Sequence, residues 1–150
     1  MSINKWGPAV WLLFHTIAEK IKEPDNTRLC REVFNQIKNI CKYLPCPDCA
    51  SHATTNLANV NISRINNKTD LKQVLFIFHN SVNVRKKKAV VSIDELEKYK
   101  TANFSNVLQN FKLNYNSTRN MKLMSDSFQR KIVIAQFYQW LELNKGGLGG

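Results

Sequence analysis

The sequence lacks the long apolar runs and the cysteine density that mark two large classes of protein. None of its apolar stretches approaches the ~18–20 residues that a membrane-spanning helix needs. Four cysteines among 150 residues are too few for the disulfide scaffold of a small secreted protein. A chain of this length buries roughly 68–70% of its unfolded surface and folds without covalent staples. We therefore expect one domain whose cysteines serve chemistry rather than structure.

Several other signals are missing or scarce. No signal-peptide cleavage motif or internal repeat is visible, so we expect residence in the cytoplasm. Short apolar strands do not alternate with helices, which argues against a thioredoxin-like βαβ core. Acidic residues number 11 against 22 Lys and Arg, a formal net charge of +11. This charge permits attraction to nucleic acid, acidic proteins or an anionic cofactor without choosing among them.

The stretch around Cys46 and Cys49 carries the strongest local signal. Pro47 suits the first position of a helix, so we predict a short helix over residues 48–58 with Cys46 near its N-cap. A thiol there faces unpaired N–H groups and the positive end of the helix dipole, which predicts a lowered pKa for Cys46. A reactive thiolate beside a second thiol is equipped for disulfide exchange. The same spacing also supplies half of a zinc site.

Apolar residues at helical spacing predict helices along the whole chain. They cover about residues 7–22, 26–43, 70–86, 104–112 and 126–143, and a capping-box pattern at Ser92 predicts a short helix to about residue 102. We expect Thr69 or Asp70 to cap the helix over 70–86. Residues 59–68 read as a polar connector, and residues 145–150 as a flexible tail.

Two polar clusters interrupt the apolar stripes. Gly7, Trp11 and His15 recur every four residues on one helical face, where they can clamp an aromatic ligand or simply pack against another helix. His79 and Asn83 lie one turn apart and either cap the end of the bundle or bind a ligand.

The remaining cysteines, Cys30 and Cys41, lie on one predicted helix. They are eleven residues apart, a rise of ~16 Å that excludes a disulfide between them. We expect two buried thiols.

Three motifs in chain order resemble the Erv/ALR family of FAD-dependent sulfhydryl oxidases. They are Gly7-x-x-x-Trp11-x-x-x-His15, Cys46-x-x-Cys49-x-x-His52 and His79-Asn80-x-Val82-Asn83. Their order, internal spacing and helical setting match the family over about residues 5–100. The short N-terminus, the sequence Leu44-Pro45-Cys46-Pro47 and the lack of further Cys-x-x-Cys motifs look most like the small enzymes of large DNA viruses.

The resemblance implies an all-α fold, a four-helix bundle with a short fifth helix, that holds FAD non-covalently within residues 1–102. Cys49 corresponds to the thiol that lies against the isoalloxazine ring and passes electrons to the flavin. Cys46 corresponds to the more exposed interchange thiol that reacts with substrate thiols. The reduced flavin then gives its electrons to O2, yielding H2O2. Residues 103–150 lie outside the resemblance, and we expect a helical extension packed on the core or in a dimer interface.

The resemblance also implies which residues contact the cofactor. Positions around the adenine and ribose match Trp11, His15, His79 and Asn83. Other positions on the cofactor surface match Gly7, His52, Asn80 and Val82, and the usual cation near the FAD phosphates falls at Lys88. Many members have an aromatic residue where this chain has Val74 and a cation where it has Ile3, so adenine packing and phosphate contacts are expected to differ in detail.

Partners follow from what the chain lacks. It has neither the distal shuttle Cys-x-x-Cys nor the long-range disulfide of cellular members, so we expect an external thioredoxin-like dithiol carrier. The resemblance itself implies O2 as acceptor and a homodimer, with no nucleic acid required. Two other classes compete. A zinc module using Cys46, Cys49 and His52, with or without Cys41, leaves Trp11, His15 and the cluster of His79 and Asn83 unexplained. A basic nucleic-acid binder leaves the cysteines unexplained.

Overall fold

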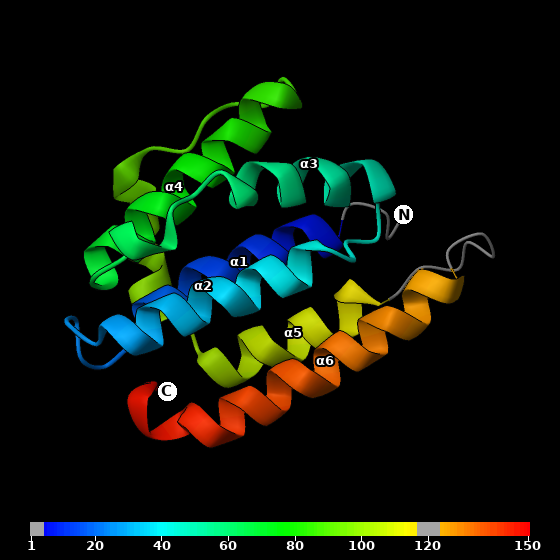
Figure 1. The fold of residues 1–150 in the computed structure, drawn as a ribbon. Helices are drawn as coiled ribbons and strands as arrows, with labels where there is room; N and C mark the ends of the chain where they lie inside the picture. The colour runs from blue at the N-terminus through cyan, green and yellow to red at the C-terminus, as the bar shows by residue number, and fades with distance from the viewer. Residues whose placement is uncertain (1–4, 117–123) are drawn as a thin grey trace.

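The fold is a stack of three helix pairs. The computed structural model describes residues 5–116 and 124–150, with side chains from residue 126 onward in the second range. In the middle layer lie α1 (Trp6–Glu19) and α2 (Thr27–Cys41); α3 (Pro47–Ala58) and α4 (Lys68–Arg85) cover one side, and α5 (Phe104–Tyr115) and α6 (Met124–Asn144) cover the other (Figure 1). The predicted all-α fold is confirmed, with α1–α4 as the bundle.

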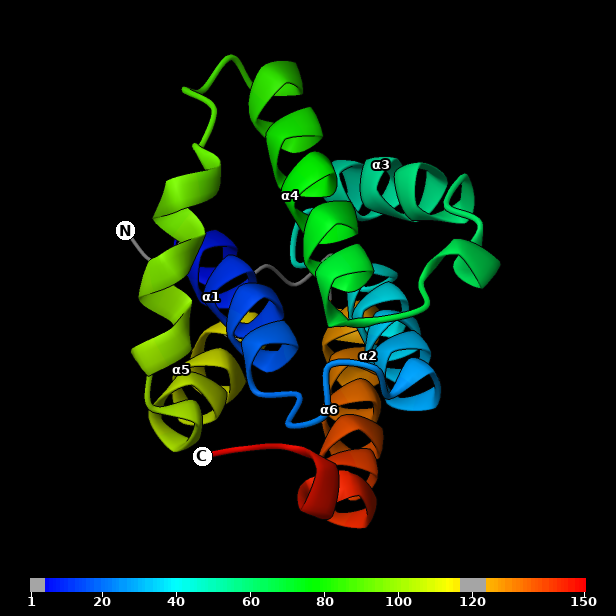
Figure 2. The same ribbon diagram turned by 90° about the vertical axis from the view of Figure 1, so that its left-hand side faces the viewer.

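Three short 3₁₀ segments connect or extend these helices: η2 (Ile62–Arg64), η3 (Ile93–Thr101) and η5 (Lys145–Gly147). The predicted short fifth helix is η3, which runs beside α1 (Figure 2). It is a 3₁₀ helix, and the predicted capping box does not form, because the Ser92 side chain makes no cap hydrogen bond. The predicted cap of α4 is also wrong. Asn67 takes that place, its backbone extended and its side chain accepting from the Asp70 N–H at 2.8 Å.

Helix α1 is the centre of the molecule. Every residue from Leu13 to Ala18 is buried, because α1 packs against α4 and η3 as well as against α5. A helix that is covered on more than one side needs apolar residues around most of its circumference. The polar members of that stretch, His15 and Thr16, therefore stand out, since buried polar groups require partners.

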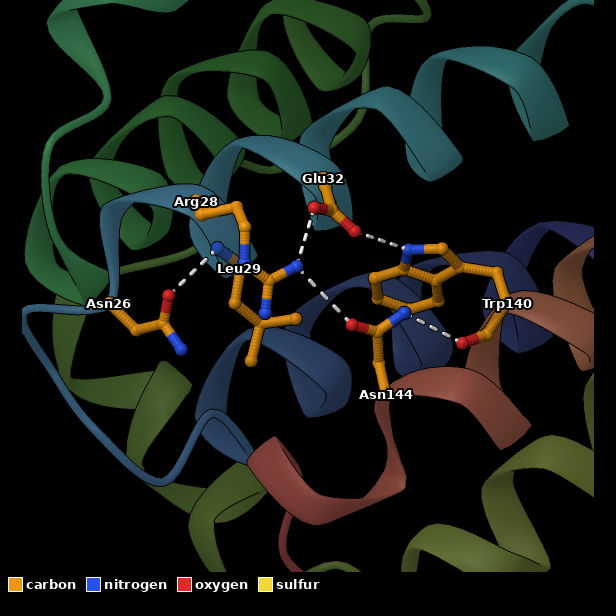
Figure 3. A network of polar contacts seen from close by, with 6 residues as sticks. All are labelled: Asn26, Arg28, Leu29, Glu32, Trp140 and Asn144. Atoms are coloured by element: carbon orange, nitrogen blue, oxygen red, sulfur yellow. Dashed lines mark hydrogen bonds and ion pairs between the residues drawn. The ribbon is translucent and has the colours of Figure 1, made fainter.

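Helix α6 is held to α2 by a polar network at its C-terminal end (Figure 3). The indole Nε1–H of Trp140 donates to the Glu32 carboxylate at 2.9 Å, and Arg28 pairs with the other oxygen of that carboxylate at 2.6 Å. Asn144 joins the network by accepting from Arg28 at 3.4 Å. The hydrogen bond from Trp140 is the largest cause of a lowered pKa for Glu32.

Two buried polar side chains fasten α5 and α6 to the C-terminal end of α2. Tyr115 donates its hydroxyl to the Ile40 carbonyl at 2.7 Å, and Arg130 donates to the Tyr43 carbonyl at 3.1 Å. Burial raises the pKa of Tyr115 and lowers that of Arg130. The extension is thus joined to the core by specific hydrogen bonds as well as by apolar packing.

The glycine-rich C-terminal end is docked, which corrects the prediction of a flexible tail over residues 145–150. Leu148 is buried and pairs with Ile21 as an isolated antiparallel bridge. The Gly149 N–H donates to the Lys20 carbonyl at 2.6 Å, and the Lys22 N–H donates to the Gly147 carbonyl at 2.9 Å. A side chain at Gly147 would lie 2.8 Å from Leu29, so glycine permits this close approach.

Within the described part of the chain, none of the helices has the length and apolar character needed to cross a membrane. Ile3 lies outside the described residues.

The docked end generates a stability prediction. Leu148→Ala should lower the free energy of unfolding by about 2 kcal/mol, because it removes a buried side chain from the core. Leu143→Ala is the matched control, since Leu143 is 79% exposed and its truncation should change stability by less than about 0.5 kcal/mol. Urea unfolding of both variants checks this. Equal stability of the two variants would contradict the docking of the tail.

Candidate functional site

A cavity of about 450 Å³ opens between α1, α3, α4 and the segment that contains η3. Among the residues that the sequence assigned to a cofactor, the structure brings these to its wall: Gly7, Trp11, Cys49, His79, Val82, Asn83 and Lys88. They come from four separate parts of the chain. The volume lies within the roughly 300–1,000 Å³ that is usual for small-molecule sites.

A stack of rings lies along one wall of the cavity. Trp11 and His79 are nearly parallel, with ring centroids 3.9 Å apart and an interplanar angle of 7°. His15 lies behind them, with its Nε2 2.8 Å from Nδ1 of His79 and its ring 4.8 Å from that of Tyr99. Trp11 and His15 are one turn apart on α1, which is why the sequence spacing places both toward α4. His15 thus supports His79 from behind and is absent from the cavity lining.

The two histidines form a neutral pair. Burial, followed by the charge of the partner histidine, lowers the pKa of His15 from 6.5 to about 3. Burial and the charge of Lys98 lower the pKa of His79 from 6.5 to about 4. With both rings neutral, one nitrogen of the contact donates and the other accepts. If both rings were protonated, His15 Nε2 and His79 Nδ1 would both be donors, and the hydrogen bond between them would be lost.

The Cys-x-x-Cys motif adopts the predicted helix start. Pro47 is the first residue of α3 and Cys46 is its N-cap, with the Cys46 Sγ accepting from the Cys49 N–H at 3.2 Å. Cys49 lines the cavity, whereas Cys46 is half-buried and lies outside the lining. One thiol of the pair therefore lines the cavity, and the other does not.

The predicted lowering of the Cys46 pKa is wrong. Burial is the largest cause of a raised pKa for this thiol, and the hydrogen bond between the two thiols raises it further. The backbone N–H of Cys49 and the charge of Lys86 act in the opposite direction but are outweighed. The helix N-terminus thus acts as predicted, but it does not decide the direction of the pKa shift, because the thiol is partly withdrawn from water and is hydrogen-bonded to the neighbouring thiol.

Two other predicted residues lie away from the cavity lining. The side chain of His52 is 53% exposed and lies 3.4 Å from the Asp48 carboxylate. The Asn80 side chain makes two hydrogen bonds with the backbone of Val91. It donates to the carbonyl at 3.0 Å and accepts from the N–H at 2.8 Å. Asn80 therefore holds the segment before η3 against α4, and Val91 in turn lines the cavity.

Sequence reasoning missed several residues of the cavity wall. Those with charged or aromatic side chains are Trp6, Phe14, Phe78, Arg85, Lys86, Lys98 and Tyr99. The run of basic residues after α4 was a signal for Arg85 and Lys86. Tyr99 and Lys98 carried no local signal, because only the docking of η3 beside α1 brings them to the site.

The other cysteines are buried, as predicted. Burial raises the pKa of both Cys30 and Cys41. Cys41 also contributes to the cavity wall, where a thiol that stays protonated behaves as a small apolar group. Residues 5–116 and 124–150 contain no group of three or more His, Cys, Asp or Glu side chains placed to hold a metal ion.

The histidine pair generates a prediction about pH. As pH falls below 6.5 the unfolded chain takes up protons at both histidines, whereas the folded chain does so only near pH 4 and 3. The stability from the neutral pair is therefore complete above pH 6.5 and is lost as pH falls toward 3. Replacing both residues (His15→Gln with His79→Gln) should flatten this decline, as measured by denaturant unfolding from pH 7 to 4. Parallel declines in both proteins would refute it.

The Cys46 thiol gives a second prediction. In the reduced protein, the rate of alkylation of Cys46 by iodoacetamide should have its midpoint above the ordinary pKa of 9.0. Lys86→Gln should move it higher still, because the lysine charge stabilises the thiolate. Peptide mapping by mass spectrometry at each pH gives the rate for this cysteine alone. A midpoint at or below about pH 7.5 would instead indicate an activated thiolate.

Comparison with known proteins agrees with this geometry. The model of the Erv1 / Alr family matches residues 8–102, from α1 to the end of η3. An African swine fever virus protein (isolate Pig/Kenya/KEN-50/1950) named FAD-linked sulfhydryl oxidase is 34% identical over 90 residues, which cover 60% of this chain and 75% of the relative. A fowlpox virus protein named "Probable FAD-linked sulfhydryl oxidase FPV093" is 32% identical over 78 residues, which cover 52% and 74%. No solved structure gives a match. The chain belongs to the Erv1 / Alr family.

Proposed function

We propose that this protein is an FAD-linked sulfhydryl oxidase that forms disulfides in thiol substrates and passes the electrons to O2, giving H2O2. The observation that carries the proposal is the division of the Cys-x-x-Cys pair: Cys49 lines the cavity and Cys46 lies outside it. A dithiol placed in this way can exchange with a substrate on one side and with a bound cofactor on the other. The names of the viral relatives support the same activity.

The residues present fit FAD. Its phosphates need cations, and the ends of Arg85, Lys86, Lys88 and Lys98 contribute to one cavity wall. Its ring systems need flat or apolar surfaces, which Trp11, His79 and Phe78 supply. In this proposal Trp11, His79 and Asn83 hold the adenine and ribose, and Lys88 lies by the phosphates. His15 acts through His79, to which it is hydrogen-bonded.

The remaining candidates have less direct roles. Gly7 and Val82 leave room on the cavity wall for the cofactor. Asn80 fixes the segment that brings Val91 and η3 to the site. His52 contacts the Asp48 carboxylate beside the cysteines, and the Arg85 guanidinium lies 3.5 Å from the same carboxylate.

The disulfide exchange follows from the placement of the two sulfurs. In the oxidised enzyme a substrate thiolate attacks Sγ of Cys46, and Cys49 leaves as the thiolate. A second substrate thiolate then attacks the substrate sulfur of the mixed disulfide, which forms the product disulfide and releases Cys46 as the thiolate. The raised pKa of Cys46 slows attack by this thiol but not attack upon it. When bound, FAD accepts two electrons from the dithiol and delivers them to O2, which takes up two protons to become H2O2.

We further propose that residues 1–102 form the catalytic domain and that α5 and α6 form a C-terminal helical extension to it. The expected homodimer, the thioredoxin-like dithiol carrier and residence in the host cytoplasm or at a virus assembly site belong to the same proposal. The family match ends at residue 102, which supports this boundary.

The first experiment is a visible absorption spectrum of the purified protein, before and after dithiothreitol is added in air. A flavin spectrum with consumption of O2 is expected. Cys49→Ser should retain the flavin and lose at least ~100-fold in turnover, because the thiol that faces the cofactor is gone. Cys46→Ser should also retain the flavin and lose exchange with substrate disulfides and thiols.

Cys30→Ser is the control, since Cys30 lies in the core away from the cavity lining and should leave turnover unchanged. A protein that stays colourless when supplied with FAD would refute the proposal. So would wild-type rates of dithiothreitol oxidation in both Cys46→Ser and Cys49→Ser.

A further inference from the structure

Helix α4 ends in a run of four exposed basic residues, Arg85 to Lys88, beside the cavity mouth. Arg85 lies 3.5 Å from Asp48, the residue between Pro47 and Cys49. The Lys86 ammonium lies 5.7 Å from the centre of the Trp6 ring, at the start of α1. The first contact places Arg85 next to the start of α3, where Cys46 is the N-cap, and the second places Lys86 next to the start of α1.

Lys87 has a backbone conformation that favours glycine. Its φ is +59°, the only positive φ of a non-glycine residue in the described part of the chain. It sits at the left-handed position of a Schellman end, with the Lys87 N–H donating to Val84 and the Lys88 N–H donating to Asn83. Glycine fills this position without strain, so the lysine side chain does not serve the helix end.

Neither the helix dipole nor the proposed phosphate contacts account for Lys87. The helix dipole favours a cation in the last turn, which accounts for Arg85. The proposed phosphates account for Lys86 and Lys88, whose side chains contribute to the cavity wall. Lys87 is absent from that wall and lies beyond the last turn of the helix.

The positive charge at this place is not cancelled locally. Asp48 is the acidic residue within the Cys-x-x-Cys loop, and its carboxylate is engaged by Arg85 and His52. The charge of Lys86 reaches Cys46, where it partly offsets the rise of the thiol pKa that burial causes. The proposed phosphates take up part of the charge of Lys86, so Lys87 together with the remainder presents positive charge to a group that approaches Cys46.

We infer that Lys86 and Lys87 form a docking rim that selects dithiol proteins carrying acidic residues beside their reactive cysteines. The inference rests on the proposed oxidase function and adds the class of its substrate. An acidic side chain near the substrate cysteine pairs with Lys87 while the cysteine sulfur reaches Sγ of Cys46. Attraction of this kind acts mainly on the rate of association and is weakened by salt.

The probes for the test are three reduced peptides that share one Cys-x-x-Cys sequence and differ only in flanking residues: Glu, Gln or Lys. O2 consumption gives kcat/KM for each with the flavin-loaded enzyme. At low salt the Glu-flanked peptide should exceed the Lys-flanked one by about tenfold or more. The ratio should fall toward one as salt screens the charges.

Two variants of Lys87 separate its proposed role in substrate docking from its effect on the stability of the helix end. Lys87→Gln should reduce the preference for the Glu-flanked peptide several-fold, while dithiothreitol oxidation and flavin content stay unchanged. Lys87→Gly should lose the same preference and yet raise the midpoint of thermal unfolding, because glycine relieves the strained φ. Lys22→Gln is the matched control, since Lys22 is an exposed lysine in the loop at the opposite end of α1 (Figure 1).

Equal kcat/KM for the Glu- and Lys-flanked peptides in an enzyme that oxidises dithiothreitol would overturn the docking rim and leave the oxidase proposal intact. An unchanged preference in Lys87→Gln would also overturn it. A protein that oxidises neither dithiothreitol nor any peptide would instead count against the oxidase function itself.

Discussion

The hydrogen bond between His15 and His79 is the contact on which the site depends. It joins α1 to α4 through two buried rings, at a Nε2 to Nδ1 distance of 2.8 Å. Because both rings are neutral, the contact needs one donor and one acceptor, which fixes how the two helices face each other. Trp11, one turn before His15, then lies flat against His79 and forms the cavity wall. A polar pair inside the core thus orients the apolar surface that meets the ligand.

The site combines residues of the core with residues at the edge of the fold. The ring stack joins α1, α4 and η3, whereas Cys46 and Cys49 stand at the first turn of a short helix. The two thiols lie at the edge of the fold, where the proposed partner protein can reach them, whereas the histidines of the ring stack are buried. The extension of α5 and α6 supports this arrangement from the opposite side of α1 and α2, through packing and through hydrogen bonds of Tyr115, Arg130 and Trp140.

The basic residues Arg85 to Lys88 have two proposed roles. The basic run after α4 contributes cations to the cavity through Lys86 and Lys88, and it leaves Lys87 facing outward in a strained conformation. Burial, not local charge, decides the pKa of Cys46. This division fits an enzyme in which the incoming substrate supplies the attacking thiolate and the protein supplies attraction and orientation. In the proposed docking, local charge affects which partner binds more than how reactive the resting thiol is.

The sequence by itself determined the helices, the start of α3 at Pro47, and the rows of Trp11 with His15 and of His79 with Asn83. Helical periodicity and cap chemistry are local properties, so short stretches suffice to read them. The cavity lining, which includes Cys49 and not Cys46, agrees with what the resemblance implied. Only the packing of distant segments brings Tyr99 into the ring stack and Leu148 beside Ile21. It also reversed the expected pKa of Cys46. Burial depends on which distant segments meet, and that is a property of the packed chain rather than of any one stretch.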